Sequence, residues 1–490
     1  MKQFLFIVII IFLSFNLHSQ ISFFKAYSNF GYDKGEGIVQ LEDSSYLITG
    51  SSSSFSNSSQ AFILKVDSLG NRLWSKHYGG LESDKGKRIF YVPNDGIYVV
   101  GQTNSFPNTF YDGYFFKTDL EGNLIYEKHF GGQGFEDIHD AVMLEDTSFI
   151  LVGETQSTEN EVENMYIVRI NKLGDVLWEK NFGTEGKDVA RGIKVLTYNS
   201  VIIVGEYYVE DSLTQKAAIL KMHIGGIMEW LKVYGNAKGT YAINDFVIAQ
   251  NRIKTVGYNQ GIDPESETYP MRLITDLDGE FIDEGLEHYV GNQQFCLITD
   301  YNNPLKFFVT LQVKRSENFF NYDDGYDDLF IYRFQESLYY DGIGVSNSNY
   351  GQDQGNQIIK TSDGGAILVG YNQTPILGGS NITLYKIGPN DLFPPSGILP
   401  VMSTLVSINE LDMKLPTINI SPNPVENELN LSKIPFEIKS VSIYNQQGKK
   451  VLSKDYFQDK IDVQYLSNGM YFLVLENKNG SKNTFKFMKN

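Results

Sequence analysis

A phrase of roughly 17 residues recurs along this chain at an interval of 52 residues. It occurs as ILKVDSLGNRLWSKHYGG from Ile63, FFKTDLEGNLIYEKHFGG from Phe115 and IVRINKLGDVLWEKNFG from Ile167. Its turn glycines, spaced by 52, 52, 52 and 53 residues, are Gly70, Gly122, Gly174, Gly226 and Gly279. A second phrase, such as YLITG or ILVG, ends at Gly50, Gly101, Gly153, Gly205, Gly257 and Gly370. The gap before the last of these is two periods plus an insertion, so we count seven units.

Each unit divides into four short strands. An apolar run such as GEGIVQL precedes a tight turn, as at 94–96 and 363–365. A second apolar strand, a variable polar loop such as SSSSFSNSSQ, and the strands AFILKVD and RLWSKHY follow. No segment sustains a 3.6-residue period. Tandem four-stranded antiparallel units are typical of propeller blades, so the sequence predicts an all-β fold with a seven-bladed β-propeller over residues 21–391.

The two ends of the repeat complement each other. The segment ISFFKAYSNFGYDKG from Ile21 matches a fourth strand, with no strands one to three before it. The last unit ends near Asp391 after its third strand. We therefore expect a ring closed by a blade shared between the two ends, which removes exposed sheet edges, rather than an open solenoid.

The recurring polar and aromatic residues have structural explanations. Aspartates at equivalent loop positions are expected to accept backbone N–H bonds between blades rather than bind metal; they are Asp33, Asp84, Asp137, Asp188 and Asp353. Aromatic residues four positions after the turn glycines are expected to pack between blades; they are Trp74, Tyr126, Trp178 and Trp230. The repeat is thus predicted to be a scaffold.

The D-x-L-G-x-x-x-W phrase resembles the tryptophan-docking repeats of quinoprotein-like propellers, and the whole unit resembles repeats of exported Bacteroidetes proteins. The resemblance covers residues 21–391 and implies the fold. Quinoprotein enzymes are known for a vicinal disulfide and a bound calcium, but Cys296 is the one cysteine of this chain, so no disulfide can form within it. Cys296 lies in the apolar stretch QQFCLIT and is expected to be a small buried hydrophobe.

The period stops at Gly388, and residues 392–415, which contain several prolines, are predicted to be a linker. Residues 416–490 alternate apolar and polar positions, as an immunoglobulin-like β-sandwich would. They resemble the type A C-terminal sorting domain of the type IX secretion system, with an accessory binding sandwich as the alternative. The matching motif residues are Pro422, Asn423, Pro424, Gly448, Gly469, Tyr471 and Lys486. The resemblance implies the type IX secretion machinery as a partner, then attachment or release, usually with cleavage of the domain.

The N-terminus has the features of a secretory signal. Lys2 precedes an apolar run over 4–15, and small residues follow near Ser19, so residues 1–20 are predicted to be a cleaved signal peptide. No cysteine follows, which argues against a lipoprotein anchor. No later run reaches the ~18–20 apolar residues of a membrane span. We expect a monomer that is secreted or attached to the outer-membrane surface, without a transmembrane segment in the mature chain.

Charge and motifs restrict the chemistry. With 41 basic and 59 acidic residues the formal net charge is −18, which disfavours nucleic acid as a partner. No nucleophile elbow, Walker loop or zincin motif occurs, so no catalytic residue, no cofactor and no enzyme is predicted. One acidic group in the sixth unit can hold calcium, with a solvated loop as the alternative; it comprises Asp323, Asp324, Asp327 and Asp328.

These observations favour a binding or adhesion scaffold that recognises an extracellular glycan or protein through its variable loops. One alternative is an extracellular polysaccharide-acting enzyme with its site at the mouth of the propeller channel; another is a structural surface-layer component. Carboxylates with shifted pKa and aromatics at one channel mouth would favour the enzyme. A channel lined by backbone and small residues would argue against it.

Overall fold

The structure is a computed structural model in which strands are the regular elements. It describes residues 22–29, 31–56, 58–106, 110–158, 162–236, 239–261, 268–286, 293–300, 307–314, 327–334, 353–373, 379–389, 401–403, 419–422, 424–432, 438–445, 449–454, 460–477 and 482–490. Within these ranges there is no α-helix, and hence no helix long and apolar enough to cross a membrane. The predicted signal peptide lies outside them.

Seven sheets form the blades; six have antiparallel strands in the order of the chain, and the seventh has the order β25-β26-β27-β1-β28. The innermost strands are β2 (Asp33–Gln40), β6 (Asp84–Val92), β10 (Glu136–Met143), β14 (Val189–Thr197), β18 (Gly239–Ala249), β22 (Gln293–Asp300) and β25 (Asp353–Lys360). The second strands are β3 (Tyr46–Ser52), β7 (Gly96–Thr103), β11 (Phe149–Thr155), β15 (Ser200–Val209), β19 (Arg252–Gly261), β23 (Phe307–Lys314) and β26 (Ala366–Gln373).

The outer half of each blade follows the same order. The third strands are β4 (Gln60–Val66), β8 (Asp112–Thr118), β12 (Asn164–Ile170), β16 (Thr214–His223), β20 (Thr268–Asp276), β24 (Asp327–Phe334) and β27 (Ser380–Ile387). The fourth strands are β5 (Arg72–Tyr78), β9 (Leu124–Phe130), β13 (Val176–Phe182), β17 (Ile227–Tyr234), β21 (Phe281–Leu286) and, for the seventh blade, β1 (Phe23–Tyr27). The described part of the sixth blade comprises three strands.

Burial falls from the middle of a blade to its outer edge. Every residue of β7 and β11 is buried, whereas most of β13 is exposed. The middle strands pack against neighbouring blades on both faces, which explains why their sequences are nearly continuous apolar runs. The cores therefore lie between adjacent blades, as in the cluster that combines Phe149 and Val168 of the third blade with Tyr98 and Phe115 of the second.

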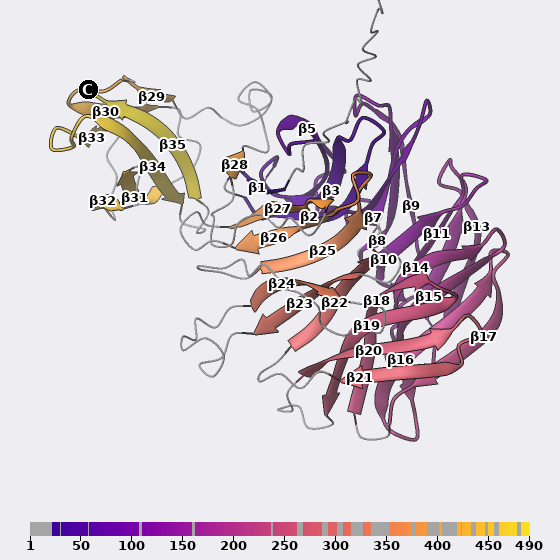
Figure 1. The fold of residues 1–490 in the computed structure, drawn as a ribbon. Coiled ribbons are helices and arrows are strands. Elements are labelled where there is room, and N and C mark those ends of the chain that lie inside the picture. The colour runs from indigo at the N-terminus through magenta and orange to yellow at the C-terminus, as the bar shows by residue number, and fades with distance from the viewer. Residues whose placement is uncertain are drawn as a thin grey trace, which may run out of the picture.

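The ring closes between the first and seventh blades. β1 pairs with β27, with Phe23 opposite Lys386 and Tyr27 opposite Ile382, and Figure 1 shows indigo β1 beside orange β27. The backbone N–H of Ile38 in the first blade donates to Gln357 Oε1 of the seventh at 2.7 Å. The predicted seven-bladed propeller with shared-terminus closure is confirmed.

The segment predicted to be a linker adds a strand to this closing blade. β28 (Val401–Ser403) pairs in parallel with β1 and forms the outer edge of the sheet. Residues 401–403 thus cover the edge that β1 would otherwise expose.

Two further sheets form the C-terminal domain, which Figure 1 shows in yellow beside the propeller. One contains β29 (Asn419–Ser421), β30 (Glu428–Ser432) and β33 (Lys460–Asp462). The other has the order β32 (Lys450–Lys454), β31 (Ile438–Asn445), β34 (Gly469–Asn477) and β35 (Lys482–Lys489). A shared core that includes Val425, Leu429, Leu473 and Phe487 makes this a β-sandwich, as predicted.

Candidate functional site

All seven innermost strands contain a one-residue register shift near their start, the pattern of a β-bulge. The extra residues are Glu36, Lys87, His139, Arg191, Asn244, Cys296 and Asn356. A bulge leaves its extra residue out of the ladder and redirects the side chain. Because the innermost strands surround the central channel, these positions form a ring there, with chemistry that differs from blade to blade. We call these seven positions the bulge ring.

The glycine that ends the second repeated phrase accommodates the bulge. A Cβ at Gly153 would lie 1.8 Å from the Asp137 carbonyl oxygen, and one at Gly50 would lie 1.9 Å from that of Lys34. Only glycine permits so close a backbone approach. Sequence reasoning missed the bulge ring, but this repeated glycine, opposite the innermost strand, was a signal that could have revealed it.

Several charged residues in the channel neutralise one another. Glu36 lies 3.1 Å from Lys85 and 3.2 Å from Lys87 of the next blade. Arg191 Nε donates to Glu206 Oε1 at 2.5 Å. Burial alone would raise the pKa of Glu36, but the two lysines outweigh it and lower the pKa to about 2. The channel is therefore strongly polar and is not lined by backbone and small residues alone.

Asp137, His139 and Glu154 of the third blade form a distinct group, which we call the channel triad. Asp137 pairs with Glu154 across β10 and β11, and His139 is the extra residue of the adjacent bulge. One donor atom from each residue lies within 4.8 Å of the other two, with His139 Nε2 4.0 Å from Glu154 Oε1. Asp137 Oδ1 and His139 Nε2 are buried and have no hydrogen-bond partner among the residues that the structure describes. No other such group of potential metal ligands occurs in the described ranges.

The surroundings of the channel triad shift the pKa of all three residues. Burial raises the pKa of both Asp137 and Glu154, although nearby lysines oppose the increase. Burial, together with the positive charges of Lys87 and Arg191, lowers the pKa of His139 well below its usual value. His139 is therefore a neutral imidazole at neutral pH, the form that accepts a proton or binds a metal ion.

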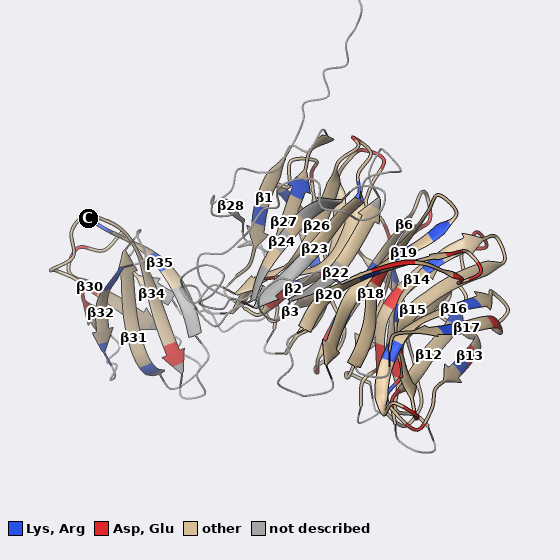
Figure 2. Ribbon diagram, turned by 60° about the horizontal axis from the view of Figure 1, so that its bottom comes forward, with Lys and Arg blue, Asp and Glu red and all other residues tan. Residues whose placement is uncertain are grey.

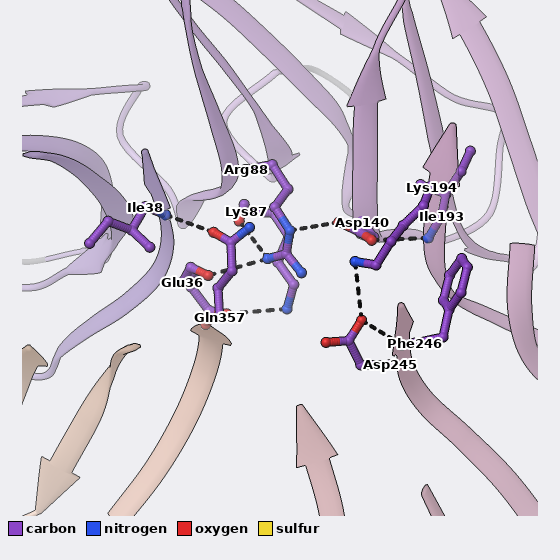
Figure 3. A network of polar contacts seen from close by, with 10 residues as sticks. All are labelled: Glu36, Ile38, Lys87, Arg88, Asp140, Ile193, Lys194, Asp245, Phe246 and Gln357. Atoms are coloured by element: carbon purple, nitrogen blue, oxygen red, sulfur yellow. Dashed lines mark hydrogen bonds and ion pairs between the residues drawn. The ribbon is translucent and has the colours of Figure 1, made fainter. Parts of the chain in front are cut away.

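The residues directly after the bulges connect neighbouring blades, as Figure 3 shows. Arg88 Nε donates to Asp140 Oδ1 at 2.6 Å, and the backbone N–H of Ile193 donates to Asp140 Oδ2 at 3.0 Å. The N–H of Ile298 likewise donates to Asp245 Oδ2 at 3.0 Å. These contacts hold the bulged strands in place, so the bulge ring is supported by a second layer of polar contacts.

The channel triad and the variable loops share one face of the propeller. Glu136, at the start of β10, is opposite Thr155, at the end of β11. In each blade the second strand therefore ends on the face of the propeller where the innermost strand begins. The variable loop that follows the second strand lies on that same face. These loops include the polar segments around 53–59 and 156–163. Figure 2 shows acidic and basic positions along the blades as well as in the loops.

The repeated aspartates mostly have the predicted role. Asp84 Oδ2 accepts the N–H of Gly80 at 2.9 Å, and Asp188 accepts those of Thr184 and Tyr208, each at 2.6 Å. Asp33 accepts a backbone hydrogen bond from Asn29 and also hydroxyl hydrogen bonds, from Ser28 at 2.7 Å among others.

The assignment of Asp137 to this series was wrong. In the third blade Glu136 takes the position, because it is opposite Thr155 just as Asp84 is opposite Thr103. Glu136 accepts hydrogen bonds from Thr155 Oγ1 at 2.7 Å and from the N–H of Gly132 at 3.2 Å. Asp137 is therefore one residue further along β10, opposite Glu154, and belongs to the channel triad.

The remaining predicted site residues are only partly described. Asp323 and Asp324 lie outside the described residues; Asp327 and Asp328 begin β24, but their side chains are not described. Cys296 is an extra residue of the bulge ring, and its side chain is likewise not described. The calcium hypothesis stays a prediction.

The sorting motif lies on the C-terminal sandwich. Tyr471 is buried, its ring stacks on Phe487 at 5.7 Å, and its hydroxyl donates to the Ser467 carbonyl at 2.9 Å. Pro422, Pro424 and Lys486 are exposed, and Gly469 has φ +154. Asn423 and Gly448 lie outside the described residues.

Comparison with protein families identifies this C-terminal domain. Residues 419–490 match the family described as the secretion system C-terminal sorting domain. The fold and this match define an exported β-propeller protein with a type IX secretion sorting domain, which is secreted or attached to the outer-membrane surface. No curated protein matches the chain in sequence.

Solved structures similar to the chain are distant. The Pan2 WD40 domain of Neurospora crassa is 10% identical, with 74% of this chain and 91% of that chain covered and a TM-score of 0.43. The extracellular domain of a hybrid two-component system from B. thetaiotaomicron is 10% identical, with 94% and 57% covered and a TM-score of 0.38. An α-L-arabinanase from Penicillium chrysogenum is 11% identical, with 76% and 99% covered and a TM-score of 0.42.

Proposed function

We propose that this protein is an extracellular binding module whose ligand is a glycan recognised at the loop-bearing end of the channel. The observation that carries the proposal is the bulge ring, in which the same β-bulge places a different polar side chain in the channel from each of several successive blades. A repeat used only as a scaffold does not need such variety. Ligand sites commonly lie at the mouths of closed β-structures, where a few polar groups converge.

A glycan suits this lining because sugar hydroxyls both donate and accept hydrogen bonds. The described channel residues provide carboxylates such as Glu206, cations such as Lys85 and Arg191, and the phenol rings of Tyr258 and Tyr371. The cations are paired with carboxylates, so the lining is close to neutral although the chain carries a net charge of −18. A mixed, nearly neutral lining favours a polyhydroxylated ligand over a strongly charged one.

A glycan array with the full secreted chain tests the proposal, followed by titration calorimetry with any glycan that binds. We expect Arg191→Met to weaken binding by tenfold or more, because it removes the guanidinium that Glu206 holds in the channel. Lys128→Ala is the control, since Lys128 lies on the outer strand β9 and its side chain is half-exposed. The absence of glycan binding, or equal binding by both variants, would contradict it, and binding to extracellular proteins alone would favour a protein ligand.

An extracellular polysaccharide-acting enzyme is the second candidate. It is favoured by the convergence of two carboxyl groups, Asp137 and Glu154, with His139 inside the channel. Glycoside hydrolysis generally uses a pair of carboxyl groups on either side of the scissile bond. Release of reducing ends from a polysaccharide panel, lost in Asp137→Asn and Glu154→Gln but kept in Lys128→Ala, would support this candidate. No release from any substrate would exclude it for that panel.

A further inference from the structure

We propose that the channel triad, Asp137, His139 and Glu154, binds a divalent first-row transition-metal ion of the zinc or manganese type. The inference does not depend on the proposed glycan-binding function, because its test uses the metal ion alone. It concerns a different part of the chain from the acidic segment 323–328, for which the sequence suggested calcium.

The distances suit three ligands of one small ion. The candidate donor atoms lie within 4.8 Å of one another, and His139 Nε2 and Glu154 Oε1 are 4.0 Å apart. Ligand bonds of about 2 Å separate neighbouring ligand atoms by roughly 3 to 4 Å. Donor atoms that lie up to 4.8 Å apart therefore need to approach one another by about 1 to 2 Å, which side-chain rotation can supply.

Two potential ligand atoms of the channel triad have no hydrogen-bond partner among the described residues. They are Asp137 Oδ1 and His139 Nε2, which are both buried, and a buried polar atom without a partner is energetically unfavourable. A carboxylate oxygen and a neutral imidazole nitrogen are both electron-pair donors, so a single cation satisfies them together. An anion would meet the same carboxylate with repulsion and is not supported here.

Glu154 is already oriented for ligation. Its Oε2 atom lies 2.8 Å from Lys187 Nζ, while Oε1 is the oxygen nearer to His139. Lys187 therefore takes the role of an outer partner that fixes the carboxylate and leaves the other oxygen available.

The neighbouring cations are largely compensated. Lys85 and Lys87 both pair with Glu36, and Arg191 pairs with Glu206. Lys187 neutralises Glu154, which leaves Asp137 as the carboxylate of the channel triad without its own cation. The site therefore accepts a cation, although the net charge of Glu36 with its two lysines weakens the affinity.

The imidazole of His139 favours one class of metal ion over another. Calcium and magnesium prefer oxygen ligands, whereas zinc and manganese accept mixed nitrogen and carboxylate sets. Three protein ligands leave a coordination position open, as in catalytic rather than structural zinc sites. We therefore expect an exchangeable ion that can also contact a ligand in the channel.

Titration calorimetry and elemental analysis of the chelator-treated full chain test the site with ZnCl2, MnCl2 and CaCl2. We expect one equivalent of zinc or manganese per chain, calcium binding at least tenfold weaker, and a His139→Ala variant at least thirtyfold weaker for the same metal. Asp175→Asn is the control, because Asp175 is an exposed carboxylate of the same blade whose ion-pair partner is Lys128 of the outer strand β9. It should keep the stoichiometry.

Two further measurements make the outcome decisive. Visible absorption of the Co²⁺ form reports directly on a bound nitrogen ligand, and its bands should change in His139→Ala at an unchanged urea-unfolding midpoint. Lys87→Met should raise the metal affinity severalfold, because it removes a nearby positive charge. Metal binding that survives His139→Ala, calcium binding as tight as zinc binding, or weaker binding in Lys87→Met would overturn the proposal.

Discussion

The Trp178 ring of the third blade lies directly against Gly226, the turn glycine of the fourth blade. A Cβ at Gly226 would be 3.1 Å from the indole Cδ2 atom, and the indole N–H donates to the Ile224 carbonyl at 3.1 Å. The contact recurs where Gly122 meets Trp74 and where Gly279 meets Trp230. The predicted inter-blade role of the repeated aromatics is thereby confirmed for these three tryptophans, and each contact joins a residue to one 48 or 49 positions further along the chain.

Gly226→Ala should destabilise the propeller by about 1–2 kcal/mol, because φ is +83 and the new methyl group meets the Trp178 ring. Trp178→Ala should cost about 3–5 kcal/mol through the cavity that it leaves. The double variant should cost less than the sum, since the methyl group then enters that cavity. Urea unfolding of the four proteins measures the coupling; strict additivity would show that the two residues do not interact.

Glu36→Gln should destabilise the protein by about 3 kcal/mol near pH 6, because the pKa of Glu36 falls from 4.5 to about 2 on folding. A lowered carboxyl pKa stabilises the fold above the unfolded value, and this stabilisation disappears as the pH falls toward 2. The difference from the wild type should therefore shrink between pH 5 and pH 2. Denaturant unfolding across that range measures it.

Glu280→Gln is the control for this pH dependence. Glu280 also forms an ion pair, with Lys232, but its side chain is 75% exposed. Such an exposed ion pair contributes only about 0–1 kcal/mol to the free energy of unfolding. A pH-independent difference for Glu36→Gln would mean that the two channel lysines do not set its pKa.

Asp140→Ala should lower the free energy of unfolding by about 3–5 kcal/mol. The change removes the carboxylate that accepts hydrogen bonds from the largely buried Arg88 and from the N–H of Ile193. Asp140→Asn should cost less, because the amide oxygen still accepts one of these bonds. Asp175→Ala removes an exposed partner of Lys128 and should change stability by less than about 1 kcal/mol. Equal effects of all three variants on the unfolding free energy would argue against the inter-blade role of Asp140.

Removal of residues 22–29 should open the ring, because β1 is the fourth strand of the seventh blade. The deletion exposes the edge of β27 and loses the Phe24–Tyr385 stack, whose ring centroids are 4.0 Å apart. We expect a lower thermal midpoint and a tendency to aggregate, both reversed by a synthetic peptide of residues 22–29. A scrambled peptide should have no effect, and an unchanged midpoint in the deletion variant would contradict closure by β1.

The repeat by itself determined the architecture of this protein. A period of 52 residues, with a turn glycine such as Gly226 in five units and an aromatic ring such as Trp178 in four, specifies blades of one size. The unmatched strand at the start of the repeat and the missing strand at its end specify closure. These features are visible in the sequence because they depend on local turn geometry and on apolar periodicity, which repeat with the chain.

Only the tertiary structure decided which residues line the channel. Asp137 and Glu136 are adjacent, and either fits the loop position by spacing, yet the pairing of Glu136 with Thr155 turns Asp137 toward His139 and Glu154. The bulge ring unites residues spaced by about one repeat, and six different residue types occupy its seven positions, so no motif marks it. The physical reason is that a bulge is set by the register between two strands, and register depends on how the whole blade packs.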